Sequence, residues 1–169
     1  MGAELLVMAL LPLLLAAAAG WDLATFTIPN FLQLALMLSF SLFAIAAHLT
    51  PGLIGLHLLA GIAGLVMGFA LFAFGYIGGG DAKLFGAVAL WLGFHDLLAY
   101  ALAASMFGGL LTLTLLALRQ WPLPAIAARQ QWIMRLHAEK AGIPYGVALA
   151  AGAFVLLPHT EIFRLAAGA

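Results

Sequence analysis

The sequence contains no cysteine, and only 7% of its residues carry a charge. The absence of cysteine excludes disulfides, iron–sulfur clusters, thiolate metal sites and cysteine nucleophiles. The formal net charge is zero, so no global field would attract nucleic acid or an acidic substrate. Hydrophobic residues make up 66% of the chain, far above the roughly 45–50% of soluble domains. We therefore expect an integral membrane protein with no nucleic-acid partner.

Long apolar runs, separated by breakers such as Pro29–Asn30, predict the helices, since a bilayer span takes about 20 mostly apolar residues. The predicted helices are Leu5–Gly20, Phe31–Leu49, Leu53–Phe74, Ala82–Phe94, Leu97–Leu118 and Ile143–Leu157. The first run lacks the positive n-region of a signal peptide, so we expect it to be retained as a helix. The sequence thus predicts an all-α integral membrane protein, a single domain over residues 1–169 with about six transmembrane helices.

One long polar stretch, at about 119–142, sets the predicted orientation. Its charged residues are Arg119, Arg129, Arg135, Glu139 and Lys140. Short loops rich in Lys and Arg stay on the cytoplasmic side of a membrane. Counting the predicted spans back from this loop puts the N-terminus outside. The segments that hold Asp22 and Asp81 then both face the cytoplasm.

Asp22 and Asp81 are the acids with the most unusual surroundings, because each lies between two predicted spans. Ionisable groups within a membrane domain are costly, and a functional role is the default interpretation. Asp81 follows Gly78–Gly80, a run that permits positive φ and close backbone approach. Asp22 precedes Ile28–Asn30. Each acid also has a plainer interpretation, Asp81 as the N-cap of the next helix and Asp22 as an interfacial acid.

As a pair, the two carboxylates have a chemistry that neither has alone. Two carboxylates held close together cannot both ionise easily, so they share a proton. The ionised group can activate water, while the protonated group donates to a scissile carbonyl oxygen. The patterns HExxH, GxSxG and the P-loop are missing, and His57 has no acid or second histidine at i+3 or i+4. We therefore expect neither a metal nor a cofactor.

These motifs together resemble the type IV prepilin peptidase family of GxGD intramembrane aspartyl proteases. The matching segments are Asp22 with Ile28-Pro29-Asn30, then Gly78-x-Gly80-Asp81-Ala82-Lys83, and later Ile143-Pro144-Tyr145-Gly146. The resemblance implies that Asp22 and Asp81 form the catalytic dyad. It also implies a site-shaping part for Gly78, Gly79, Gly80, Lys83, Pro29, Asn30, Pro144 and Tyr145.

The same resemblance implies a substrate and a location. The substrate is a prepilin or pseudopilin, cut after its basic leader at the cytoplasmic side of the bacterial inner membrane. Larger members carry a cytoplasmic insertion with paired cysteines, which is linked to N-methylation of the mature pilin. This chain has neither, so it resembles the short, peptidase-only form associated with tight-adherence pili. It also departs from many members in having no basic residue within Leu23–Thr27.

Two alternatives stay open at this point. A GxGD protease of the presenilin or signal-peptide-peptidase kind would cut transmembrane segments, but its Tyr-Asp pair and Pro-Ala-Leu motif are not found at suitable places. A small transporter or channel subunit would instead use Asp22 and Asp81 as ion sites at broken helices.

Overall fold

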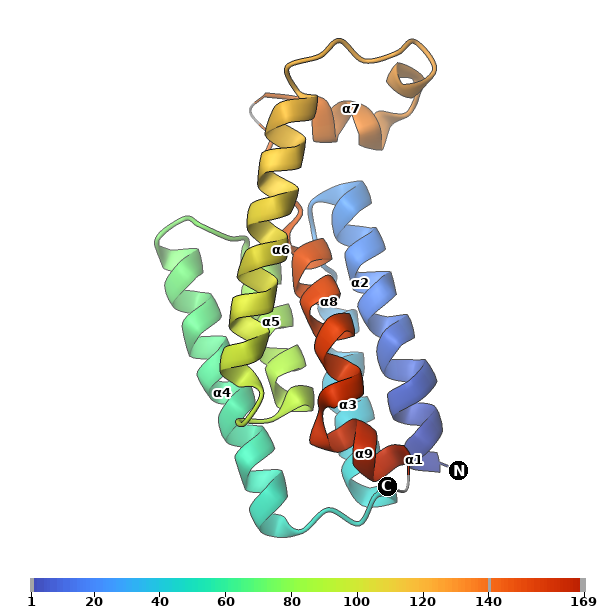
Figure 1. The fold of residues 1–169 in the computed structure, drawn as a ribbon, viewed down its shortest axis with the longest axis vertical. Helices are drawn as coiled ribbons and strands as arrows, with labels where there is room; N and C mark the ends of the chain where they lie inside the picture. The colour runs from blue at the N-terminus through green and yellow to red at the C-terminus, as the bar shows by residue number, and fades with distance from the viewer. Residues whose placement is uncertain (1, 140, 168–169) are drawn as a thin grey trace.

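The computed structural model describes residues 2–139 and 141–167, which form a bundle of helices (Figure 1). The long elements are α2 (Leu11–Thr25), α3 (Asn30–Ala46), α4 (Pro51–Ala73), α5 (Gly79–Leu92), α6 (Leu97–Leu118) and α8 (Tyr145–Leu156). The short ones are α1 (Gly2–Leu5), a π-helical turn at Leu6–Leu10, 3-10 turns at Ala127–Arg129 and Leu157–His159, α7 (Gln131–His137) and α9 (Glu161–Ala167). Each of the six predicted helices is present, and the predicted loop at 119–142 contains the additional helix α7. Lys140, one of its four basic residues, lies outside the described residues.

Local chemistry explains where several helices begin and end. Pro51 opens α4, where its missing N–H costs nothing, and the Thr50 hydroxyl accepts a hydrogen bond from the Leu53 N–H at 3.3 Å. Phe26 ends α2 by adopting a left-handed conformation with φ of 56°. Its N–H then donates to the Asp22 carbonyl at 2.8 Å. Extended backbone at Pro29 follows and leads into α3.

Two of the predicted boundaries that differ from the structure concern the acids. The first helix does not end at Gly20 but continues to Thr25, because one interior glycine costs a helix only about 1 kcal/mol. The fourth predicted helix begins at Gly79, before Ala82. Asp22 and Asp81 therefore lie in helical end turns and not in loops between spans.

The glycine run does not use the positive φ that it permits. Gly78 is extended, with φ of −75°, and Gly79 already belongs to α5. Among the glycines that the structure describes, positive φ occurs at Gly75 and Gly93. The run instead provides the expected close approach, since a Cβ on Gly80 would lie 3.3 Å from the Ile28 backbone nitrogen.

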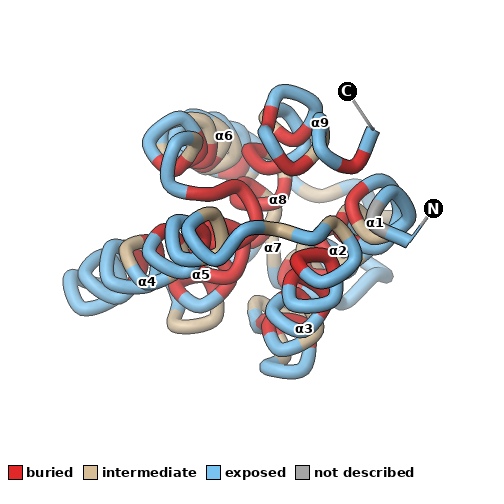
Figure 2. Tube along the Cα trace, turned by 90° about the horizontal axis from the view of Figure 1, so that it is seen from below, coloured by how far each residue is buried: buried red, intermediate tan, exposed pale blue. Residues whose placement is uncertain are grey.

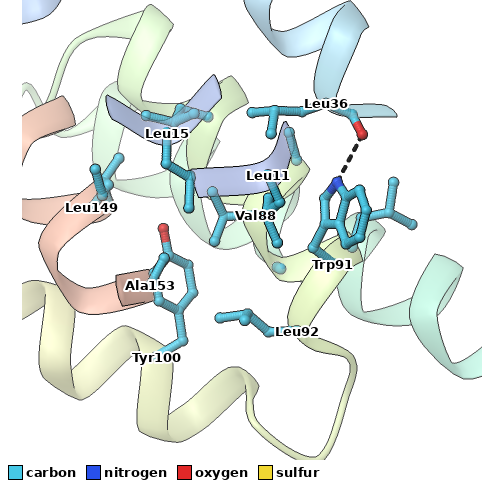
Figure 3. Packing of buried hydrophobic residues seen from close by; sticks show 14 of the residues in the cluster. Leu11, Leu15, Leu36, Val88, Trp91, Leu92, Tyr100, Leu149 and Ala153 are labelled. Carbon is cyan, nitrogen blue, oxygen red and sulfur yellow. Dashed lines mark hydrogen bonds between the residues drawn. The ribbon is translucent and has the colours of Figure 1, made fainter. Parts of the chain in front are cut away.

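Helices α5 and α8 form the centre of the bundle. α5 packs on α4, α3 and α8, while α8 packs on α6 and α2. From Asp81 onward every residue of α5 except Lys83 is buried, as the buried tube in Figure 2 indicates. A helix that is apolar all round belongs in such an interior. The core below the acids is built around Trp91 and Tyr100, and the Trp91 indole donates to the Leu36 carbonyl at 2.8 Å (Figure 3).

Small residues allow the helices to approach closely. A Cβ on Gly64 of α4 would lie 2.6 Å from Ala89 of α5. A Cβ on Gly68 would lie 2.8 Å from Ala82, also on α5. A Cβ on Gly152 of α8 would lie 2.9 Å from the backbone of α6. Packing through small residues is typical of membrane helices, which gain no hydrophobic driving force from each other in lipid.

The outer surface is apolar, as a lipid-facing surface requires. Ile45, Met106 and Leu113 are 73%, 76% and 68% exposed. Within the described part of the chain, three helical segments are long and apolar enough to cross a membrane, namely Leu6–Thr25, α4 and α6. A fourth is added if Tyr145–His159 and Glu161–Ala167, bent by 54°, count as one span. The chain is thus a multi-pass, all-α membrane protein, but α3 and α5 are shorter than full spans, so six complete spans are not reached.

Candidate active site

Asp22 and Asp81 come from different helices and meet at one end of the bundle. Both are buried, with 3% and 6% of their surfaces exposed. They line the same cavity of about 420 Å³, which Arg135 and the segment after α7 close on one side. They also line a second cavity of about 270 Å³. The fold thus brings the two acids together at one end of the bundle.

A backbone amide of α8 binds one of the two acids. The Gly146 N–H, in the first turn of α8, donates to Oδ2 of Asp22 at 2.7 Å. First-turn amides have no partner within their own helix, so they are free to bind an anionic group. A Cβ on Gly146 would lie 2.9 Å from that Asp22 oxygen. Only glycine therefore brings the amide this close.

Asp81 caps its own helix with one oxygen only. The N-cap of α5 is Gly78, and Asp81 reaches back from the third helical position to accept the Gly78 N–H at 3.0 Å. This is the carboxylate half of a capping box. The N-cap interpretation of Asp81 is thus wrong in position, although the side chain does cap. Its other oxygen, Oδ1, is buried and has no hydrogen-bond partner in the structure.

The start of α3 is joined to the start of α5 beside the acids. The Lys83 ammonium donates to Oδ1 of Asn30 at 3.0 Å. One turn further along α3, the Gln33 amide nitrogen donates to the Gly80 carbonyl at 3.2 Å. These two bonds connect the break after Asp22 with the helix end that carries Asp81.

The other predicted site residues divide into two groups. Asn30, Gly78, Gly79, Gly80 and Lys83 line the smaller of the two cavities beside both acids. Pro29 and Pro144 instead precede the first residues of α3 and α8. Tyr145 turns toward α6, where its hydroxyl lies 3.5 Å from that of Thr112 and its ring contacts Gly108. These last three residues set helix starts and do not line the cavities.

Three contributors to the site were not predicted from the sequence. Gln33 is a buried amide within an otherwise apolar predicted span, a signal that was present in the sequence. Phe26, in its left-handed conformation, lines both cavities. Arg119 donates to the Leu136 carbonyl at 2.8 Å and to the Gly142 carbonyl at 3.0 Å. It thereby holds both ends of the segment that carries Ala138 and Ala141 over the acids, and only its place in a basic stretch hinted at this.

Metal ligands are not gathered at this site. Across residues 2–139 and 141–167, no group of three or more His, Asp or Glu side chains could hold a metal ion. The groups that line the smaller cavity beside the acids include the two carboxyl groups, the Lys83 ammonium, the Asn30 amide and the backbone of the glycine run.

Comparison with known proteins identifies the family. The sequence model of the type IV leader peptidase family matches residues 9–113, a stretch that contains both aspartates. No curated protein and no solved structure gives a significant match. The family match covers more than half of the chain and confirms the resemblance seen in the motifs. This chain belongs to the type IV leader peptidase family.

Proposed function

We propose that the protein is an aspartic endopeptidase that removes the leader peptide from type IV prepilin-like substrates, with Asp22 and Asp81 as its catalytic pair. Membership of the family supports a leader-peptidase-like protease that acts on prepilin-type substrates. The assignment of Asp22 and Asp81 as the catalytic pair rests on their burial in one shared cavity, although they come from α2 and α5. Oδ1 of Asp81 also has no partner among the described residues.

The proposed mechanism divides the work between the two acids. The 2.7 Å bond from Gly146 has the length of a charge-assisted hydrogen bond, so we assign the negative charge to Asp22. The shared proton then sits on Oδ1 of Asp81, which has no hydrogen-bond partner among residues 2–139 and 141–167. Asp22 takes a proton from water, the resulting hydroxide attacks the scissile carbonyl carbon, and Asp81 protonates the carbonyl oxygen. When the C–N bond breaks, the leaving amine takes the proton held by Asp22. One hydroxyl proton of the tetrahedral intermediate returns to Asp81, which leaves a carboxylic acid and restores the pair.

The proposal includes a place in the cell and a topology. The shorter helices α3, α5 and α8 complete a six-helix membrane domain in the bacterial inner membrane, with the N-terminus outside. The basic stretch at 119–142 faces the cytoplasm, and the acids face the same side. Arg119, Arg129 and Arg135 support this orientation through the preference of basic loops for the cytoplasmic side.

The test is processing of a co-expressed prepilin, followed by mass measurement of the product's N-terminus. The wild-type chain is expected to release the leader and leave an unmethylated N-terminus. Asp22→Asn and Asp81→Asn are each expected to abolish processing while the protein still assembles in the membrane. Ion flux that depends on these two acids, without any processing, would instead support the transporter alternative.

A further inference from the structure

An apolar groove runs along the lipid-facing side of α5, between α3 and α4. Its volume is about 360 Å³. The walls are half-exposed or more exposed apolar side chains, and the floor is two small residues of α5. The lining includes Leu34 and Met37 of α3, Leu58 and Ile62 of α4, and Gly86 and Ala87 of α5. Figure 2 shows α5 between α4 and α3 when the bundle is viewed along its length.

This groove continues into the site. Asn30 and Lys83 line both the groove and the 270 Å³ cavity that holds Asp22 and Asp81. From Asn30 to Met37 the wall formed by α3 extends for about 10 Å, or two helical turns. The groove therefore leads from the apolar surface of the bundle to the level of the acids.

A buried acceptor without a partner lies at the end of the groove next to the acids. Gln33 is 5% exposed and lines the groove, and its amide nitrogen is occupied by the Gly80 carbonyl. Its Oε1 atom is buried and has no hydrogen-bond partner in the part of the chain that the structure describes. Buried polar groups are nearly always paired, so this oxygen is suited to a donor that the chain itself does not supply.

A membrane-embedded peptide can supply such a donor at one place. Within lipid a spanning segment must be helical, because every backbone N–H needs a partner there. The first turn of such a helix has free N–H groups, and the stretch that unwinds ahead of it for cleavage has more. A lipid acyl chain also fits apolar walls, but it brings no N–H or O–H to Gln33.

We propose that the groove between α3 and α4 binds the apolar membrane helix of the substrate, and that Oε1 of Gln33 accepts a backbone N–H from the unwound stretch beside the scissile bond. The inference rests on the proposed protease function, because it assumes that the substrate is cut at Asp22 and Asp81. Gln33 is then a positioning residue for the substrate, and α3, α4 and α5 together form its entry from the membrane.

Disulfide crosslinking tests the groove directly, because the chain has no cysteine of its own. Met37→Cys and Ile62→Cys are placed singly in the Asp81→Asn variant and oxidised with a prepilin that carries one cysteine in its apolar helix. The matched controls are Met106→Cys and Leu110→Cys, which are 76% and 62% exposed on α6 before substitution. Adducts are expected at the groove positions, recurring every three or four residues along the substrate helix, and not at the controls.

Substitution of Gln33 tests the acceptor. Gln33→Met removes it at similar volume, and we expect kcat/KM to fall about five- to tenfold, mainly through KM. Gln33→Glu keeps an acceptor oxygen at this position and is expected to restore KM to within about twofold. Thermal unfolding in detergent, followed for both variants, separates this effect from loss of fold. A KM that is equally raised in both variants, or unchanged in both, overturns the role of Gln33.

The outcomes separate the groove from the proposed function. Processing by the wild type together with adducts on α6, or with none on α3 and α4, overturns the groove and leaves the protease standing. A tightly bound phospholipid that Ile62→Trp displaces without changing KM also overturns it, in favour of a lipid site. Absence of processing by the wild type overturns the proposed function itself.

Discussion

The two ends of the bundle both hold polar cavities, but they treat their polar atoms differently. At the end opposite the acids, a cavity of about 320 Å³ is lined by His57, His95, Asp96 and their neighbours. His57 bonds the Leu90 carbonyl at 2.8 Å, and His95 pairs with the adjacent Asp96 at 3.1 Å. The exposed His95 thus pairs with its neighbour, and the buried His57 has a partner 33 positions away.

At the acid end, the polar side chains are buried. They form hydrogen bonds to distant segments, and some of their atoms have no partner in the described residues. Asp22 is bonded to a residue 124 positions away. Gln33 Oε1 and Asp81 Oδ1 are two of the three buried side-chain oxygens without a partner in the described residues, and the third is the Tyr100 hydroxyl in the core. An unpaired buried polar atom costs about 1–3 kcal/mol. Such a cost is tolerated where function requires it, so the difference supports the proposed catalytic role of the acid end.

The largest expected difference between the two ends is the effect of removing their acids on the processing rate. Asp22→Asn and Asp81→Asn are each expected to slow processing by at least about 10²–10⁴-fold, the usual contribution of an acid or base. The double variant should be no slower than either single variant, because the two groups act as one unit. Asp96→Asn combined with Glu161→Gln should process at the wild-type rate.

Initial rates at saturating prepilin measure these effects, and circular dichroism in detergent provides the control for folding. Multiplicative losses in the Asp22/Asp81 double variant would contradict a shared proton. A large loss in the Asp96/Glu161 variant would contradict the division between the two ends.

The helices themselves could be predicted because apolar runs and breakers such as Pro29–Asn30 and Pro51 determine them locally. Helix ends could not, since they depend on tertiary contacts. α2 extends past Gly20 to Thr25, and Phe26 caps its end. In the last turn of this helix, Asp22 accepts a hydrogen bond from the Gly146 N–H of α8. No pattern within Leu5–Thr25 contains that information.

The site could be predicted as far as its motifs, but not as a geometry. The motif around Asp81 identified the acid, and the tripeptide ending at Asn30 identified the break beside it. The contacts that assemble the cavity join residues 47 and 124 positions apart, from Gln33 to Gly80 and from Asp22 to Gly146. Spacing along the chain cannot reveal such pairs, because they arise only when α3 packs on α5 and α2 packs on α8.

Glycine substitutions provide a second test of the difference between the two ends. Gly146→Ala would place a Cβ 2.9 Å from Asp22 Oδ2 and from Ile28, so the carboxylate or the amide must move. We expect kcat to fall by about tenfold or more, because small displacements at a catalytic group are costly. Gly109→Ala, with nothing within 4 Å of the new Cβ, is the matched control.

The corresponding change at the opposite end should affect stability alone. Gly93 has φ of +86°, and a Cβ there would lie 3.1 Å from the His57 ring. Gly93→Ala is therefore expected to destabilise the fold by about 1–3 kcal/mol. The rate per folded molecule should be unchanged. Equal effects of Gly146→Ala and Gly93→Ala on kcat would remove the distinction between the ends.

A smaller effect is expected from the arginine that holds the segment over the acids. Arg119 donates to two carbonyls, those of Leu136 and Gly142, through a planar fork that a lysine cannot reproduce. Arg119→Gln is expected to lower kcat/KM about three- to tenfold, with Arg119→Lys only partly better. Proteolytic nicking within 119–142 should become faster in both variants. Arg164→Gln, at the opposite end, is the control, and an equal loss there would refute a specific role for Arg119.

The smallest effect is expected from substituting His95, at the end opposite the acids, where we expect no change in the processing rate. His95 and Asp96 form an exposed pair, with 97% of the His95 side chain accessible. Pairs of this kind contribute at most about 1 kcal/mol and are screened by salt. His95→Gln should therefore leave processing unchanged and shift the thermal midpoint slightly at low salt and not at high salt. If His95→Gln slowed processing at both salt concentrations, the far end would have to communicate with the acids through the core, and burial of unpaired atoms would no longer distinguish the acid end from the opposite one.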